Sequence, residues 1–206
     1  NDFRVTVNGI LLTEGLNRRH VQRLLVFLVF HRSTTRERIC DDLWPDTPRD
    51  KARNILRVSL SHLRKLLGPF GTALATADKE NVRLTGSVSC DVLEYVDLLD
   101  RAIAEPDERT RYLLGLKVMQ MTPRKLLFGF HDDWIDDLKT KLENQLLEVI
   151  AQMKSALLGQ GRIREAARRL EWGVRVFPEE EWLYEELIGL YMALNKPGLA
   201  QKWREV

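Results

Sequence analysis

The sequence predicts two domains, an α/β domain over residues 1–88 and an all-helical domain over residues 91–206. Strand-like alternation and turn dipeptides occur in the first part, whereas helical periodicity dominates after Asp91. Positive charge is also concentrated in the first part, where residues 1–90 carry 15 Lys and Arg against 9 Asp and Glu. The net charge of the whole chain is only +2, so the remainder is acidic. This asymmetry suggests that the N-terminal part faces a polyanion.

The N-terminal domain begins with a predicted hairpin and a helix. Alternating apolar and polar residues over 3–7 indicate a half-buried strand, and Asn8-Gly9 is a favoured two-residue turn before a returning strand over 10–12. A helix is expected over residues 18–31, because apolar residues recur there at the spacing of one buried face. These residues are Val21, Leu24, Leu25, Leu28 and Val29.

Two further helices are predicted before residue 70. Thr34 and Glu37 match a capping box, so the second helix is expected to begin at Thr34. It should end at Trp44, because the next residue is a proline. Asp50 is the expected cap of a third helix, which runs to Leu67 and stops at a Gly-Pro pair.

The third helix has two chemically different faces. At 100° per residue, its buried stripe is predicted to consist of Ala52, Ile55, Leu56, Leu60, Leu63, Leu66 and Leu67. The opposite face carries Arg53, Asn54, Arg57, Ser61, Arg64 and Lys65, with His62 at its edge. Like charges one turn apart disfavour a helix by a few tenths of a kcal/mol, and this face has no acid to offset them. An anionic partner explains the pattern, although a solvated basic face without a ligand is the alternative.

The order of elements favours the anionic partner. Residues 74–76 and 82–84 predict a hairpin with a polar tip after the basic helix. Strands, three helices and a hairpin form the order of a winged helix-turn-helix, in which the last helix enters the major groove of DNA. Arginine can pair with guanine there and asparagine with adenine. Thr76 and Lys79 lie where the hairpin would contact DNA, and Thr35 and Arg36 lie at a helix N-terminus that favours phosphate.

The second domain has the sequence pattern of a helical repeat. Helix–turn–helix hairpins are expected over residues 162–176 and 180–194, with a further helix from residue 199. Their spacing of about 35 residues is typical of tetratricopeptide-like repeats. We expect the last helix to continue beyond Val206.

Several classes of function receive no support from the sequence. The sequence contains no apolar run long enough for a membrane span and no glycine-rich phosphate loop, and we expect no secretory leader. Cys40 and Cys90 are expected to be reduced thiols, and His131-Asp132-Asp133 is interpreted as a helix-capping cluster rather than a metal site. We therefore expect a cytoplasmic protein that is not an enzyme and needs no cofactor and no metal.

Runs of residues across nearly the whole chain carry a family resemblance. In the first part these are residues 36–39, 43–46, 52–57 and 60–68, which read RERI, LWPD, ARNILR and LSHLRKLLG. They resemble the OmpR-type winged helix and, more closely, the Streptomyces antibiotic regulatory protein class. In the second part, the runs Asp91-Val92, Phe128-Gly129, Asp133-Trp134-Ile135 and residues 187–191 resemble the bacterial transcriptional activator domain that accompanies that winged helix.

The resemblance implies a bacterial transcription activator. Members bind direct repeats at promoters, often as two protomers side by side, and recruit RNA polymerase. The loop between the second and third helices is the family's polymerase-facing loop, which here implies Trp44, Asp46, Arg49 and Asp50. The helical domain is implied to serve dimerisation, ligand response or partner contact. No phosphoacceptor receiver domain precedes the winged helix in this sequence.

Two other interpretations remain open at this stage. The winged helix could bind protein rather than DNA, with the repeat domain as the scaffold of an adaptor. The chain could also be the output module of a larger sensor protein.

Overall fold

The computed structural model describes residues 4–7, 9–12, 18–122 and 129–204. The chain forms two compact units. Unit 1 comprises Asn1–Leu93 together with Leu127–Asp137, and unit 2 comprises Glu94–Leu126 and Leu138–Val206. Within the described ranges, every helix is too short or too polar to span a lipid bilayer.

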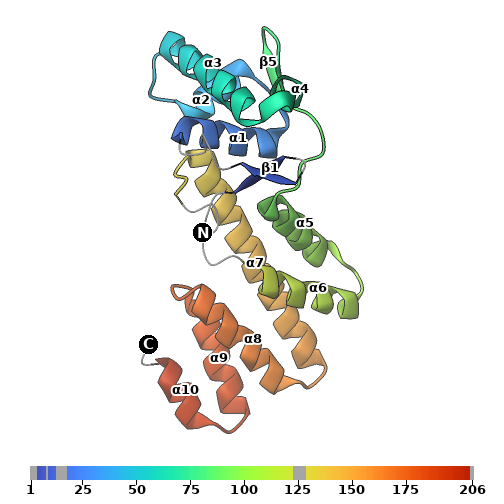
Figure 1. Ribbon diagram of the computed structural model, residues 1–206. Coiled ribbons are helices and arrows are strands. Elements are labelled where there is room, and N and C mark those ends of the chain that lie inside the picture. The colour runs from blue at the N-terminus through green and yellow to red at the C-terminus, as the bar shows by residue number, and fades with distance from the viewer. Residues whose placement is uncertain (1–3, 8, 13–17, 123–128, 205–206) are drawn as a thin grey trace. The chain divides into compact units, whose positions relative to one another are not determined.

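Unit 1 combines three main helices with two small antiparallel sheets (Figure 1). Its helices are α1 (Arg19–His31), α2 (Arg36–Leu43), α3 (Arg49–Leu66) and the short α4 (Gly71–Leu74), which follows a 3-10 turn at Gly68–Phe70. Strands β1 (Val5–Val7) and β2 (Ile10–Leu12) form the predicted N-terminal hairpin, with Val7 opposite Ile10. Strands β3 (Ser33–Thr35), β4 (Ala75–Ala77) and β5 (Asn81–Leu84) form a sheet in the order β3-β5-β4. The predicted winged helix-turn-helix fold is thereby confirmed.

Strand β3 was not expected, and it moves the start of the second helix. Thr34 pairs with Val82 of β5 and is buried, so it cannot cap α2. Thr35 is the cap instead, and its Oγ1 accepts a hydrogen bond of 3.1 Å from the backbone N–H of Arg38. The prediction of a cap at Thr34 was wrong by one residue because pairing with a distant strand determines where the helix begins.

The third helix also begins earlier than predicted. Its first residue is Arg49, and the preceding Pro48 makes no side-chain cap. Asp50 was expected to cap the helix but lies in its first turn, where a carboxylate still interacts favourably with the helix dipole.

The core of unit 1 lies where α1, α2 and α3 converge. Leu24, Phe27, Ile39, Leu56 and Leu63 are fully buried there. On α3, the predicted stripe is confirmed: Ala52, Leu56, Leu60, Leu63 and Leu67 are buried, and Ile55 and Leu66 are partly buried. Burial of such side chains contributes roughly 1.5–3 kcal/mol each, so the core fixes which face of α3 points outward.

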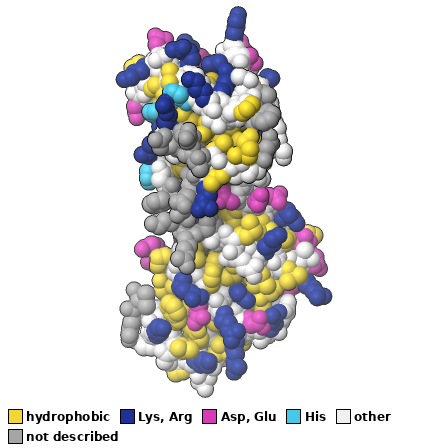
Figure 2. Space-filling model, viewed as in Figure 1, with side chains coloured by type: hydrophobic (Ala, Val, Ile, Leu, Met, Phe, Trp, Pro, Cys, Tyr) yellow, Lys and Arg dark blue, Asp and Glu magenta, His cyan; other side chains and the backbone are white. Residues whose placement is uncertain are grey.

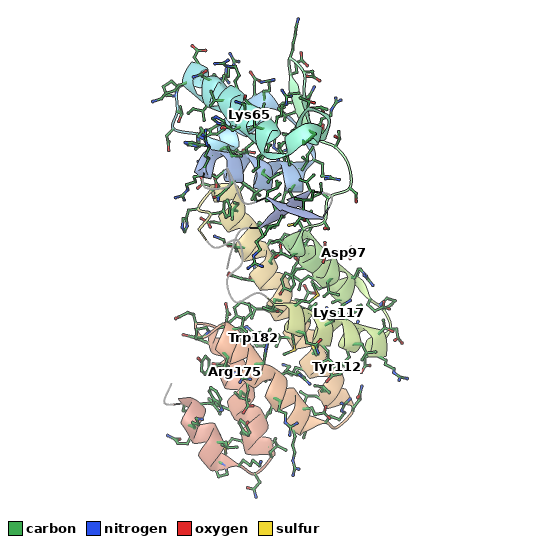
Figure 3. The ribbon with its side chains drawn as sticks, in the orientation of Figure 1. Lys65, Asp97, Tyr112, Lys117, Arg175 and Trp182 are labelled. Atoms are coloured by element: carbon green, nitrogen blue, oxygen red, sulfur yellow. The ribbon has the colours of Figure 1, made fainter. Side chains whose placement is uncertain are left out.

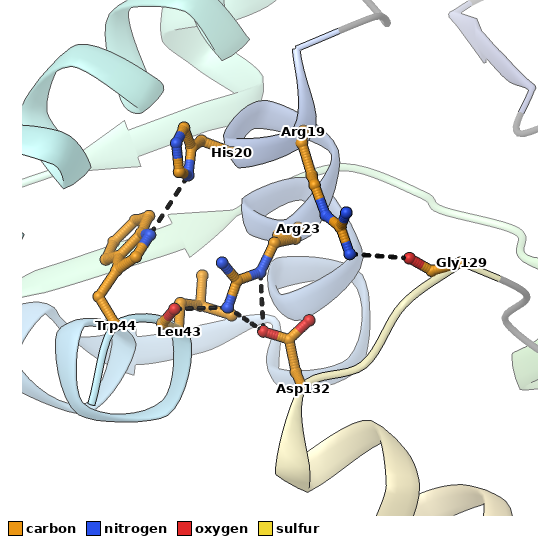
Figure 4. A network of polar contacts seen from close by, with 7 residues as sticks. All are labelled: Arg19, His20, Arg23, Leu43, Trp44, Gly129 and Asp132. Atoms are coloured by element: carbon orange, nitrogen blue, oxygen red, sulfur yellow. Dashed lines mark hydrogen bonds and ion pairs between the residues drawn. The ribbon is translucent and has the colours of Figure 1, made fainter. Parts of the chain in front are cut away.

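A segment from far along the chain completes unit 1. Asp132 is buried and forms an ion pair with Arg23, whose Nε donates to Asp132 Oδ1 at 2.7 Å (Figure 4). The same guanidinium donates to the carbonyl of Leu43. Trp134 packs edge-on against Phe27, with ring centroids 5.3 Å apart. Asp132 is therefore part of a tertiary ion pair, which the capping interpretation did not anticipate.

Unit 2 is all-helical. Its helices are α5 (Asp91–Ala104), α6 (Glu108–Met121), α7 (Asp133–Gly159), α8 (Ile163–Val176), α9 (Glu181–Ala193) and α10 (Pro197–Arg204), although α5 and α7 begin within unit 1. The helical segments predicted over 162–176 and 180–194 correspond to the single helices α8 and α9. Gly115 and Gly173 allow close helix packing. A Cβ on Gly115 would lie 2.5 Å from Met153 Sδ, and a Cβ on Gly173 would lie 3.3 Å from Leu183 Cδ2.

Candidate nucleic-acid interface

The outward face of α3 is accessible. By outward face we mean five exposed residues, Arg53, Asn54, Arg57, Ser61 and Lys65. Figure 2 shows Lys and Arg side chains gathered over α3, and Figure 3 labels Lys65 on this helix. No described part of unit 1 buries these side chains, so the face predicted from helical periodicity is free to meet a ligand.

One arginine of this face has a carboxylate partner from the neighbouring helix. Arg53 Nη2 lies 3.4 Å from Glu37 Oε1 of α2, and both side chains are more than half exposed, at 57% and 64%. Glu37 lies on another helix, so the periodicity of α3 alone could not predict this pair. Exposed ion pairs contribute about 0–1 kcal/mol, so this pair is weak enough to open if Arg53 meets a phosphate.

The side chains of Arg57 and Asn54 are coupled. Arg57 Nη2 donates a hydrogen bond of 3.0 Å to Asn54 Oδ1, one turn earlier on α3. This bond uses one of the five guanidinium N–H groups and restricts the orientation of the others. Arg57 is therefore partly preorganised for bidentate recognition of a planar acceptor.

Arg64 and His62 differ from the rest of the predicted set. Arg64 is half-buried, and its Nε donates to the carbonyl of Ala75 in β4 at 2.8 Å, so it links α3 to the hairpin. His62 Nε2 lies 2.6 Å from Arg18 Nη1. Desolvation and the nearby Arg18 and Lys65 lower the pKa of His62, which favours a neutral ring that accepts from Arg18. Arg18 was not predicted at this edge, because the tertiary fold rather than helix spacing brings it there.

The β4–β5 hairpin, which we call the wing, is held by Arg36. Arg36 Nε donates to the carbonyl of Asp78 at 2.9 Å, and its backbone N–H donates to the carbonyl of Glu80 at 2.7 Å. Backbone N–H groups of Asn81 and Glu80 bond to the Asp78 carboxylate and lower its pKa. Arg36 therefore supports the wing, and its predicted contact with a phosphate stays a prediction.

Other predicted contacts of this region differ in exposure. Lys79 is exposed at the tip of the wing, and Thr76 is half-buried opposite Arg83. Thr35 is exposed, with its hydroxyl engaged as the α2 cap. Arg83 is exposed on β5 beside these residues and was not selected from the sequence.

The loop between α2 and α3 is exposed except at Trp44, which is buried, and Thr47, which is partly buried. Trp44 is 6% exposed and packs in the core of unit 1, with its Nε1 donating to His20 Nδ1 at 3.4 Å (Figure 4). The expectation that Trp44 contacts a partner does not agree with this burial. Asp46, Arg49 and Asp50 are exposed and remain candidates for a partner contact.

Comparison with known proteins identifies the helical part of the chain. The family model "Bacterial transcriptional activator domain" matches residues 125–202, so this segment is similar to that domain. The whole chain has the fold of EmbR from Mycobacterium tuberculosis, a structure solved in complex with a low-affinity phosphopeptide. The TM-score is 0.69 at 20% sequence identity, over 97% of this chain and 55% of EmbR. No curated protein matches the sequence.

These findings support the resemblance drawn from the sequence. The chain combines an EmbR-like fold with a helical bacterial transcriptional activator domain, as expected of a Streptomyces antibiotic regulatory protein-like regulator. It spans about half the length of the EmbR chain it matches.

Proposed function

We propose that this chain is a sequence-specific DNA-binding regulator of transcription that acts in the cytoplasm by binding rather than by catalysis. The observation that carries this proposal is the exposed outward face of α3, where Arg53, Arg57 and Lys65 accompany Asn54 and Ser61 within a winged helix-turn-helix unit. An α-helix fits the major groove of B-DNA, and this face supplies both cations and hydrogen-bonding side chains.

The residues of the interface divide between two tasks. Arg57 and Asn54 are assigned to base edges, because guanidinium and carboxamide groups can form paired hydrogen bonds with guanine and adenine. Arg53 and Lys65 on α3 and Lys79 on the wing are assigned to phosphates, where charge alone determines affinity.

Binding to duplexes selected from a random pool tests this assignment. Neutralising about 4–6 phosphates gives a log–log salt slope near −4 to −5. Arg57→Ala should weaken binding to the selected duplex by about 1–3 kcal/mol, measured by fluorescence anisotropy. Arg175→Ala is the matched control, because Arg175 is an exposed arginine on α8 of unit 2 (Figure 3). If the two variants bind like the unaltered chain, α3 is not the recognition helix.

We further propose that the chain activates transcription from DNA by contacting RNA polymerase through Asp46, Arg49 and Asp50. Asp46 lies between α2 and α3, and Arg49 and Asp50 are the first two residues of α3; all three are exposed. Asp46→Ala with Arg49→Ala should reduce transcription in a reconstituted assay while leaving affinity for the promoter duplex unchanged. Equal loss of transcription and of promoter affinity would assign these residues to DNA contact instead.

The family resemblance also implies two protomers on a direct repeat, which would appear as a 2:1 protein–DNA complex by analytical ultracentrifugation.

A further inference from the structure

One residue of α3 interrupts the polar character of its exposed side. Val58 is 40% exposed. Helical geometry places it about 40° from Asn54 and about 60° from Ser61 around the helix axis. It therefore lies among the residues that point away from the core of unit 1.

The next residue makes this placement unusual. Ser59 is only 3% exposed and faces the core, so the sequence puts a hydroxyl inside and an isopropyl group outside. Regular patterning would reverse the two. Valine is also a weaker helix former than the long polar residues that suit an exposed position. Val58 is therefore only partly buried and has a low helix propensity, which is the kind of local inconsistency expected at a functional position.

The chemistry of the major groove suggests what Val58 contacts. The 5-methyl group of thymine is the apolar group that the base pairs present there, and it is recognised by apolar side chains. Resting on the proposed function, we propose that Val58 is a specificity determinant that contacts a thymine methyl next to the base read by Arg57. Val58 follows Arg57 directly in the same turn, so their side chains project about 100° apart around the axis, with that of Asn54 between them.

The expected effect is modest and local. Burial of one methyl group against an apolar side chain changes affinity by about three- to fivefold. The effect should occur at one thymine of each half-site. Arg57 should instead affect its guanine more strongly, because a hydrogen-bonded base contact discriminates by a larger factor.

Deoxyuridine substitution separates the methyl group from the rest of the base. A duplex selected by the full chain is remade with each thymine replaced singly by deoxyuridine, which keeps every hydrogen-bonding atom and lacks only the methyl. The unaltered chain should lose about three- to fivefold in affinity at one position per half-site. Val58→Ala should bind the thymine duplex more weakly and show no further loss at that position. Arg57→Ala should bind weakly but keep the distinction between thymine and deoxyuridine.

The outcomes distinguish this inference from the proposed function. If Val58→Ala retains the deoxyuridine effect, or if no position shows one, Val58 does not read a methyl although the chain binds DNA. If no duplex can be selected even at low salt, both proposals fail, and the exposed Val58 belongs to a protein contact. A circular-dichroism melt of Val58→Ala excludes unfolding as the cause of weaker binding.

Discussion

Arg57 illustrates how much a single side chain can decide in this protein. Its guanidinium is exposed on α3 and held at 3.0 Å by Asn54 Oδ1. A planar fork with fixed donors recognises a base edge, whereas an ammonium group acts as a point charge. Specificity should therefore depend on the shape of residue 57 and not only on its charge.

Arg57→Lys separates charge from shape. We expect this variant to keep the salt slope of the unaltered chain, because the charge is retained. It should lose about 1–3 kcal/mol of the preference for the selected duplex over a scrambled one, because a lysine cannot pair bidentately. Competition anisotropy measures both quantities. Retained preference would show that Arg57 contacts only phosphate.

His31 makes the stability of unit 1 depend on pH. Its ring centroid lies 4.2 Å from that of Phe27 and 5.5 Å from that of Trp134. Burial lowers the pKa of His31, with a smaller contribution from Arg38. Above its ordinary pKa of about 6.5, the ring is neutral in both folded and unfolded chains and no pH dependence arises. Below it, the unfolded chain takes up the proton first, so the free energy of unfolding falls as the pH drops towards the folded pKa.

This sign gives a direct test. The melting temperature of the unaltered chain should fall between pH 7 and pH 5, and His31→Gln should reduce that fall. His131→Gln is the control, because His131 is exposed. An unchanged pH dependence in His31→Gln would assign the effect to other groups.

At the scale of elements, the ion pair of Arg23 and Asp132 anchors the start of α7 to α1 and α2. The Asp132 side chain is 3% exposed and that of Arg23 is 20% exposed. Removing the carboxylate leaves a poorly hydrated guanidinium without its partner. Asp132→Ala should lower the free energy of unfolding by about 2–4 kcal/mol, measured by urea denaturation. The exposed neighbour Asp133 supplies the control Asp133→Ala, for which we expect a change below about 0.5 kcal/mol.

Helix packing in unit 2 allows a matched pair of glycine variants. A Cβ on Gly115 of α6 would meet Met153 Sδ at 2.5 Å, whereas a Cβ on Gly189 of α9 would meet nothing within 4 Å. Gly115→Ala should therefore destabilise the protein by about 1–3 kcal/mol through overpacking. Gly189→Ala should stabilise it by about 0.5–1 kcal/mol through helix propensity. Thermal unfolding measures both, and opposite signs are the expected result.

The elements differ in how far the sequence could predict them. The outward face of α3 follows from local periodicity, so five of its six predicted residues are exposed. Arg64 is half-buried instead, because it bonds to β4. Strand β3 has no such signal, because its three residues become a strand only by pairing with β5. The Arg23–Asp132 pair joins residues 109 positions apart, and no pattern in a single sequence links them. Trp44 was misplaced for the same reason: the Trp-Pro pair marks a helix end, while its burial depends on contacts from elsewhere in the fold.

For the whole molecule, the uneven charge of the sequence fits a division of work. The basic part contains the proposed DNA interface, and the acidic part matches a bacterial transcriptional activator domain. Phosphates attract the former at a distance, while an acidic surface of the latter would be repelled. Electrostatics alone should thus favour encounters in which α3, rather than a helix of unit 2, approaches the nucleic acid.

The docking of residues 129–137 on α1 has a consequence for how the protein is made. On the ribosome, residues 1–93 emerge without the tryptophan and aspartate that complete their hydrophobic and ionic contacts. Unit 1 therefore cannot complete its packing until more than forty further amino acids have been translated. A chimaera joined after residue 93 would lack these contacts permanently, which leaves Arg23 without its carboxylate and Phe27 without its aromatic neighbour on α1.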